Sequence, residues 1–152
     1  RGLGDVYKRQ HAEKLIPKTI SNALNQNDIP IYGTGKQIRD WLYVDDHVKA
    51  LLKVFLNGGI GQTYNIGGNN ELKNIDVVRT ICNILDKMHP KENFKYSSLI
   101  THIEDRKGHD YRYAIDATKI KEHLSWVPSE TFETGILKTV NHYINNINPN
   151  KL

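Results

Sequence analysis

Residues 38–47 are Ile38-Arg39-Asp40-Trp41-Leu42-Tyr43-Val44-Asp45-Asp46-His47. The first seven alternate in polarity and are rich in β-branched and aromatic residues, so they predict a strand over 38–44. Asp45 and Asp46 then favour a helix start, because carboxylates are stabilised at the positive end of the helix dipole. Apolar residues continue at helical spacing to Phe55, and the Asn-Gly-Gly sequence at 57–59 predicts the helix end. A strand followed directly by a helix indicates an α/β fold.

The rest of the chain continues this mixture of short helices and strands. The predicted helices cover residues 13–26, 74–85, 118–124 and 131–147. The predicted strands cover residues 28–32, 63–66, 99–103 and 113–115, with a charged loop over 105–112. Asn74 is expected to cap its helix, and Cys82 lies on the apolar face of that helix, where a core residue is expected. These elements predict an α/β chain without a long series of strand–helix–strand units.

The composition is typical of a soluble globular protein. The 152 residues are 38% hydrophobic and 25% charged, which suits one ordinary domain and argues against wholesale disorder. No apolar run approaches the roughly 20 residues of a membrane-spanning helix. The single cysteine excludes an internal disulfide and a cysteine-based zinc site, so a cytoplasmic protein without a membrane partner is expected.

The formal net charge of +4 is compatible with two classes of ligand. A nucleic acid would need basic residues gathered in a patch or an arm, whereas the 21 Lys and Arg are spread along the chain. An anionic small molecule also suits a basic surface. Composition alone does not choose between them.

The common catalytic motifs are absent from this sequence. It contains no G-x-G-x-x-G, P-loop, G-x-S-x-G, H-E-x-x-H or Cys-x-x-Cys pattern. The seven histidines show no metal-ligand spacing on a predicted helix. Asp45, Asp46 and His47 lie at a helix start, where carboxylates already have a structural role. No catalytic or metal-binding residue is therefore predicted.

Three polar loops suit an anionic nucleotide instead. Residues 30–40 combine proline, tyrosine and two glycines with Arg39 at the edge of a strand. Residues 64–74 end at a predicted helix N-terminus, where oriented backbone amides favour anions. Residues 105–110 form the charged loop that contains Arg106.

The two arginines of these loops have two interpretations. Arg39 and Arg106 could clamp a diphosphate, because the guanidinium group binds phosphate oxygens bidentately. Alternatively, each arginine could form a surface ion pair with its neighbouring aspartate, Asp40 or Asp105. The sequence leaves both interpretations open.

Several blocks of sequence together resemble a known family. In order, the blocks are QHAEKLIP (10–17), PIYG (30–33), IRDWLYVDDH (38–47), YNIGG (64–68), NIDVV (74–78), DRKGHD (105–110), RYAIDA (112–117) and ETFETGI (130–136). They resemble the C-terminal part of the dTDP-glucose 4,6-dehydratases, which are extended short-chain dehydrogenases/reductases. The resemblance runs from about residue 10 to residue 147. The block at 38–47 alone would indicate only the superfamily, whereas the full set narrows it to the dehydratases.

The resemblance implies a fold and a reaction. The fold would be the C-terminal substrate-binding part of an extended short-chain dehydrogenase, an NAD-binding Rossmann fold, with most of the Rossmann domain missing here. The reaction would convert dTDP-glucose to its 4-keto-6-deoxy product with loss of water, with NAD taking up and returning the hydride. The family's Tyr-x-x-x-Lys pair, Thr-Asp-Glu trio and Gly-rich NAD loop have no match in this sequence. The chain is therefore expected to bind no NAD and to be inactive alone, while the full-length parent would be a homodimer.

The resemblance also implies which residues hold the dTDP-sugar. Lys14 and Leu15 would line the pocket, residues 30–32 would pack around the thymine, and the loop 105–109 would close the site. Arg39 and Arg106 would bind the diphosphate. The expected substrate-binding residues are Lys14, Leu15, Pro30, Ile31, Tyr32, Arg39, Asn74, Asp105, Arg106, Lys107, Gly108 and His109. Lys107 stands where the family usually has proline, so the loop is expected to be looser here.

The expected organisation has three parts. Residues 1–9 would be an unrelated leader, 10–147 the nucleotide-sugar-binding region and 148–152 a polar tail. Residues 37–56 are expected to pack on the absent NAD domain. Without that domain, six apolar side chains would lack cover: Leu42, Val44, Val48, Leu51, Leu52 and Phe55.

Two alternatives are weighed against this hypothesis. Within the superfamily, the alternative is a UDP-sugar epimerase or decarboxylase, but the wording of IRDWLYV (38–44) and DRKGHD (105–110) argues against it. In another functional class, a basic module that binds nucleic acid would need aromatic residues interleaved on a basic face, and the sequence does not show that arrangement.

Overall fold

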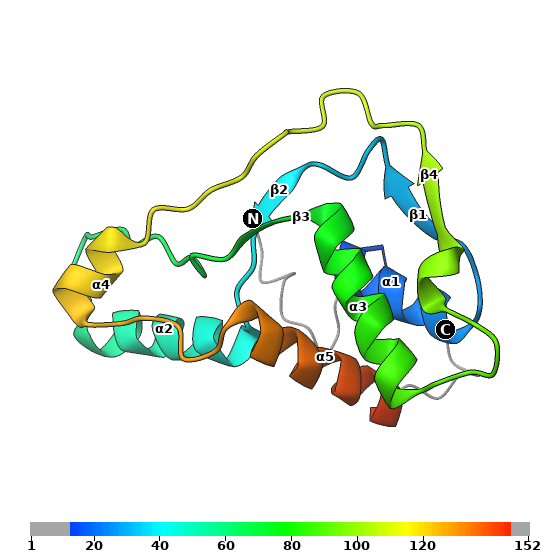
Figure 1. The fold of residues 1–152 in the computed structure, drawn as a ribbon. Helices are drawn as coiled ribbons and strands as arrows, with labels where there is room; N and C mark the ends of the chain where they lie inside the picture. Colours follow the sequence, from blue (N-terminus) through cyan, green and yellow to red (C-terminus); the bar gives the residue numbers. More distant parts are fainter. Residues whose placement is uncertain (1–12, 147–152) are drawn as a thin grey trace.

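The computed structural model describes residues 13–146, so the expected leader 1–9 and tail 148–152 lie outside the described residues. The elements in chain order are α1 (Leu15–Leu24), β1 (Ile29–Tyr32), β2 (Ile38–Asp40), α2 (Val44–Asn57), β3 (Glu71–Lys73), α3 (Asn74–Met88), the 3-10 helix η2 (Tyr96–Leu99), β4 (Ile100–Ile103), α4 (Thr118–Leu124) and α5 (Phe132–Asn146). Figure 1 shows α2 and α4 at one end and β1, β4, α1 and α3 at the other. This arrangement confirms the predicted α/β class.

Two small sheets hold the extended segments together. β1 and β4 are parallel, with Ile29 opposite Ile100, and their order requires the crossover through α2 and α3. β2 and β3 are antiparallel, with Ile38 opposite Lys73. In β1 the side chains alternate between core and exterior, because successive strand residues point to opposite faces.

The main core lies where α1, α3 and α5 pack beside β1. Its fully buried side chains include Ile20 of α1, Val78 of α3 and Val140 of α5. Cys82 is buried in this core, as predicted, and burial raises the pKa of its thiol to about 11. A second, smaller core joins α2 to α4 through Ala50 and Ile120.

The predicted strands at 38–44, 63–66 and 113–115 are corrected by the structure. The first ends at Asp40, where pairing with β3 ends, and Val44 already belongs to α2. Residues 63–66 form no strand, because they make no ladder hydrogen bonds with another described segment. Residues 113–115 are not a strand either, since pairing with β2 stops at one bridge between Ile38 and Arg112.

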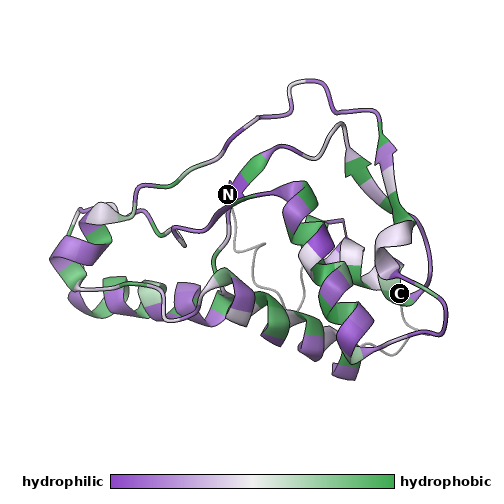
Figure 2. Cartoon of the chain, in the orientation of Figure 1, coloured by the Kyte–Doolittle hydropathy of each residue, from purple (hydrophilic) through white to green (hydrophobic). Residues whose placement is uncertain are grey.

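The expected uncovered face of α2 is only partly present. Val44 is buried and Leu42 is half-buried against the α2–α4 core, so the expectation is wrong for these two residues. The remaining four side chains of the set are exposed, at 40–85% of their full area: Val48, Leu51, Leu52 and Phe55. Figure 2 shows apolar and polar residues alternating along this helix.

Candidate functional site

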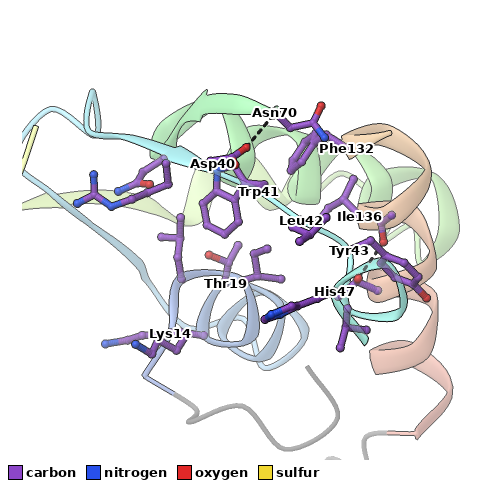
Figure 3. A pocket seen from close by; sticks show the side chains of 18 of the residues that line it. Lys14, Thr19, Asp40, Trp41, Leu42, Tyr43, His47, Asn70, Phe132 and Ile136 are labelled. Atoms are coloured by element: carbon purple, nitrogen blue, oxygen red, sulfur yellow. Dashed lines mark hydrogen bonds between the residues drawn. The ribbon is translucent and has the colours of Figure 1, made fainter. Parts of the chain in front are cut away.

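One cavity of about 870 Å³ lies between α1, the ends of β1 and β2, the start of α2 and the first turns of α5. Its walls come from segments that are far apart in the sequence, so tertiary packing builds it. Most of the residues predicted to bind substrate line it, namely Lys14, Leu15, Pro30, Tyr32, Arg39, Asn74, Arg106 and His109. Figure 3 shows Thr19 of α1 on one side of this space, with Trp41 and Leu42 across from it, and Lys14 at the start of the helix.

Four predicted site residues do not line the cavity. Ile31 is buried in the main core, because the alternation of β1 turns it away from Pro30 and Tyr32. Lys107 and Gly108 form the exposed tip of the loop, where Gly108 has a φ of +69°. Asp105 directs its carboxylate to other residues of the protein, as described below.

Arg39 and Arg106 each contact an aromatic ring. The guanidinium of Arg39 lies 4.9 Å from the ring centre of Tyr113 and donates hydrogen bonds to the carbonyl oxygens of Ile38 and Asp110, at 2.7 and 3.0 Å. The guanidinium of Arg106 lies 5.0 Å from the ring centre of Tyr32. Such contacts orient the planar group while leaving N–H donors available.

Asp40 and Asp105, the aspartates next to these arginines in the sequence, bind other groups of the protein. Asp40 accepts hydrogen bonds from the backbone amides of Gly68 and Asn70, at 2.7 and 2.8 Å. Among residues 13–146 there is no ion pair between Arg39 and Asp40 or between Arg106 and Asp105. The surface-ion-pair interpretation is therefore not supported, and both arginines lie on the wall of one cavity.

The carboxylate of Asp105 is the centre of a hydrogen-bond network beside the cavity. It accepts hydrogen bonds from Gln37 Nε2 at 2.7 Å and from the Arg106 backbone amide at 2.8 Å, and it lies 2.6 Å from His109 Nδ1. The His109 bond and these amide donors hold the pKa of Asp105 below its usual value, although partial burial opposes them. Gly33 makes room for the carboxylate, because a Cβ there would lie 2.8 Å from Asp105 Oδ2. The Asp105 carboxylate therefore accepts hydrogen bonds from other residues of the same chain.

Asn74 is placed differently from the expectation. It is the first residue of α3, and Lys73 occupies the cap position without a side-chain cap bond. The helix instead starts against the preceding turn, since the Asn74 and Ile75 amides donate to the carbonyls of Gln37 and Gly35. Asn74 lines the cavity, and its Oδ1 is buried without a partner among the described residues. The expectation that Asn74 caps its helix is therefore wrong.

Sequence reasoning missed the other end of the cavity. Trp41 and Tyr43, between β2 and α2, line it together with His47 in the first turn of α2, and Phe132 and Ile136 of α5 line it as well (Figure 3). The alternation of 38–44 gave one available signal, because Trp41 lies on the same side as Arg39 in an extended segment. Nothing local signalled that α5 would complete this wall.

The electrostatics of the cavity favour an anionic ligand. Four cationic side chains line it, Lys14, Lys18, Arg39 and Arg106, against two carboxylates, Glu13 and Asp40, and the Asp40 carboxylate is already satisfied by two amides. Cationic donors beside an aromatic ring suit a phosphorylated ligand that carries a flat group. Within residues 13–146 no cluster of His, Cys, Asp or Glu has the arrangement of a metal site. The described helices also include none of the length and hydropathy that crossing a bilayer requires.

Comparison with known proteins gives a consistent result. The family model "GDP-mannose 4,6 dehydratase" matches residues 4–139. A dTDP-glucose 4,6-dehydratase of Escherichia coli is 58% identical over 137 residues, which are 88% of this chain and 38% of that protein. The chain therefore spans about two fifths of the length of such relatives.

Solved structures show the same fold. A dTDP-glucose 4,6-dehydratase from Bacillus anthracis, in complex with NAD, is similar with a TM-score of 0.79 and 44% identity, over 90% of this chain and 41% of that one. A dTDP-glucose 4,6-dehydratase from Streptomyces venezuelae, also with NAD bound, is similar with a TM-score of 0.78 and 36% identity, over 90% and 40%. The elements of residues 13–146 are thus arranged as in part of an extended short-chain dehydrogenase, which confirms the expected fold class.

Proposed function

Because this chain belongs to the family of the GDP-mannose 4,6 dehydratase model, we propose that it is the nucleotide-sugar-binding part of a dTDP-glucose 4,6-dehydratase. The relatives at 58–60% identity that carry this name support the choice of reaction. The parent protein would remove water from dTDP-glucose and form dTDP-4-keto-6-deoxyglucose. This part would hold the nucleotide and the diphosphate.

The observation that carries the proposal is the meeting of two arginines in one cavity. Arg39 follows β1 and its turn, and Arg106 belongs to the loop after β4, yet both line the same space. Tyr32 lies beneath the Arg106 guanidinium and offers a ring face and edge to the thymine. The two guanidinium groups would then bind the diphosphate, since each charge-assisted hydrogen bond contributes about 1.5–3 kcal/mol.

We assign the NAD-binding site to the rest of the protein. A dinucleotide site needs a strand, a Gly-rich turn and a helix whose N-terminus meets the pyrophosphate. Here the turn at Gly33 and Gly35 leads from β1 into β2 instead of into a helix, so the described residues do not fit NAD. We assign the hydride and proton transfers to residues beyond this chain, and we expect the chain alone to be inactive.

The rest of the protein would also cover α2. Its four exposed apolar side chains form a face that a further domain would bury. The extended residues 63–66 support the same proposal, because in the described part of the chain they have strand-like sequence without a neighbouring strand. Residues 37–56 are thus proposed to pack on the NAD domain. The full-length protein is proposed to be a homodimer.

Two other functions are disfavoured. A UDP-sugar epimerase would need the same anion site, but the identity of 58–60% to dTDP-glucose dehydratases favours the dehydratase. A nucleic-acid module would need a broad basic surface with several stacking aromatics, whereas Tyr32 and the two arginines line a single, partly open cavity.

Calorimetric titration of the chain tests the proposal. We expect dTDP to bind more tightly than UDP, and a single-stranded oligonucleotide to bind weakly with a steep salt dependence. NAD is expected to give no heat of binding. A chain that binds the oligonucleotide more tightly than dTDP, or UDP more tightly than dTDP, would contradict the proposed function.

A further inference from the structure

The helix α2 ends at the one Asn-Gly pair of the sequence, Asn57-Gly58. Asn57 is the last helical residue and is exposed, and Gly58 follows it as the C-cap in an extended conformation. The Gly58 amide donates a hydrogen bond to the Val54 carbonyl at 2.8 Å. A Cβ on residue 58 would collide with that same oxygen, so this helix end requires glycine. The fold therefore places a backbone amide without a hindering side chain directly after an exposed asparagine.

The last turn of α2 is exposed on several sides. Phe55 and Leu56 are 85% and 65% exposed, and Ile60 in the following loop is fully exposed. The last turn contains no basic residue that would compensate the negative end of the helix dipole. Helix ends with few buried side chains open at a low cost in free energy. The bond from Gly58 to Val54 should therefore break and re-form often, and each opening releases the Gly58 amide.

We propose that Asn57 is a site of spontaneous deamidation that loosens the end of α2. In the open turn, the Gly58 nitrogen loses its proton to water and bonds to the side-chain carbonyl carbon of Asn57, whose amide nitrogen leaves as ammonia. Water then hydrolyses the cyclic imide at one of its two carbonyls. The product is aspartate, or isoaspartate when the main chain runs through the former side-chain carbon. The net change exchanges NH2 for OH and requires no oxidant, reductant or cofactor.

Both products disfavour the helix end. Each places a carboxylate at the negative end of the α2 dipole, where an anion is destabilised. Isoaspartate also adds a carbon to the main chain between positions 57 and 58. The Gly58 amide then no longer meets the Val54 carbonyl with its original geometry. The modification therefore promotes the same opening that permits it.

Asn57 does not belong to the exposed apolar face of α2. Helical periodicity places it on the side of Ala50, opposite Leu52 and Phe55. A domain that covers the apolar face would therefore leave Asn57 accessible to water. Asn57 also lies outside the residues that line the cavity, so the inference is independent of the proposed function.

Peptide mapping by mass spectrometry tests the site in the intact chain. We expect Asn57 to be modified during incubation, faster at mildly alkaline than at neutral pH, because the attacking amide must lose its proton. Asn93 is the matched control, since it is exposed in a turn with a φ of 53° but precedes Phe94, whose side chain hinders the attack. Asn93 should stay intact while half of Asn57 reacts. An unmodified Asn57, or equal rates at the two positions, would overturn the proposal.

Asn57→Gln separates the chemistry from the exposure of the helix end. Its side chain is one carbon longer, so the same attack would have to form a six-membered ring and is slow. We expect no modification at position 57 in this variant, with Asn93 unchanged and with circular dichroism equal to that of the parent. Modification of this variant at the rate of the parent would overturn the proposed attack by Gly58.

Asn57→Asp tests the effect on the helix, because it reproduces one of the two products. The protection of the Gly58 amide against hydrogen exchange should fall by about two- to fivefold, which corresponds to an unfavourable charge at a helix end. Asn57→Gln, which adds no charge, should keep the protection of the parent. Equal protection in Asn57→Asp and Asn57→Gln would overturn the loosening of α2.

Discussion

Asp46 at the start of α2 accepts hydrogen bonds from the hydroxyl of Ser129 at 2.5 Å and from its backbone amide at 2.9 Å, although the two residues are 83 positions apart. The amide of Glu130 donates to the same carboxylate at 2.8 Å. Asp46 is 1% exposed, so water does not compete for these bonds. The carboxylate thereby fastens the start of α2 to the segment before α5. These two elements carry the end of the cavity that faces Trp41.

Asp46→Ala should destabilise the protein strongly. The substitution leaves the Ser129 and Glu130 amides without their acceptor, and each unsatisfied buried group costs about 1–3 kcal/mol. We expect the free energy of unfolding in urea to fall by about 3 kcal/mol. Asp45→Ala is the matched control, because Asp45 lies one residue earlier on the same helix and is exposed; it should change the value by less than about 0.5 kcal/mol. Equal effects of both substitutions would refute the role of Asp46.

Asp46 should also give the stability a dependence on acidic pH. Burial disfavours the charged form, but the bonds from Ser129, Glu130 and Lys49 outweigh it and hold the pKa of Asp46 below its usual value. A carboxyl whose pKa is lower when folded stabilises the fold above its unfolded pKa of about 3.9, and this contribution is lost as the pH falls through the folded pKa. The difference in unfolding free energy between the parent and Asp46→Asn should therefore be constant near pH 7 and shrink below about pH 4. A difference that grows on acidification would contradict this sign.

Sequence reasoning predicted the helices better than the strands. The apolar spacing of 118–124 gave the bounds of α4, because an amphipathic helix is determined by residues within a few turns. Strands depend on partners far away in the sequence. β3 was missed since Glu71 and Lys73 are polar and become a strand only by pairing with β2. Residues 63–66 have the pattern of a strand but form no ladder within the described part of the chain.

The candidate site could be predicted to a similar extent. Arg39, Arg106 and Tyr32 were available from loop composition and resemblance, and they do line one cavity. The hydrogen bond between Gln37 and Asp105 could not be predicted, because it joins positions 68 residues apart. The wall made by Phe132 depends on how α5 meets α2, which no local pattern contains.

Alanine at Arg39 or Arg106 should weaken dTDP binding. Loss of one charge-assisted contact to the diphosphate costs about 1.5–3 kcal/mol, which is roughly ten- to a hundredfold in affinity. Lysine should restore the affinity only in part, since it keeps the charge and loses the planar fork. Thymidine, which has no phosphate, should bind the alanine variants and the parent equally. Alanine variants that bind dTDP as tightly as the parent would exclude the clamp.

The purified chain should not convert dTDP-glucose in the presence of NAD. The reaction needs a bound nicotinamide and a general acid–base group beside the sugar, and we have assigned both to the rest of the protein. The alkaline absorbance of the 4-keto-6-deoxy product gives the measurement, with a full-length relative as the positive control. Formation of this product by the chain alone would show that the assignment is wrong.

The exposed apolar face of α2 should bind a hydrophobic dye and promote association of the isolated chain. Phe55 is 85% exposed and Leu52 is 55% exposed, which is unusual for neighbouring apolar side chains on a surface helix. Leu52→Ser combined with Phe55→Ser should lower dye fluorescence and the associated fraction in sedimentation velocity. The melting temperature should stay nearly unchanged, because these side chains gain nothing from burial here. Val44→Ser, on the same helix but buried, should instead lower the melting temperature. A loss of stability in the Leu52 and Phe55 variant as large as that in Val44→Ser would show that the face is already covered within the chain.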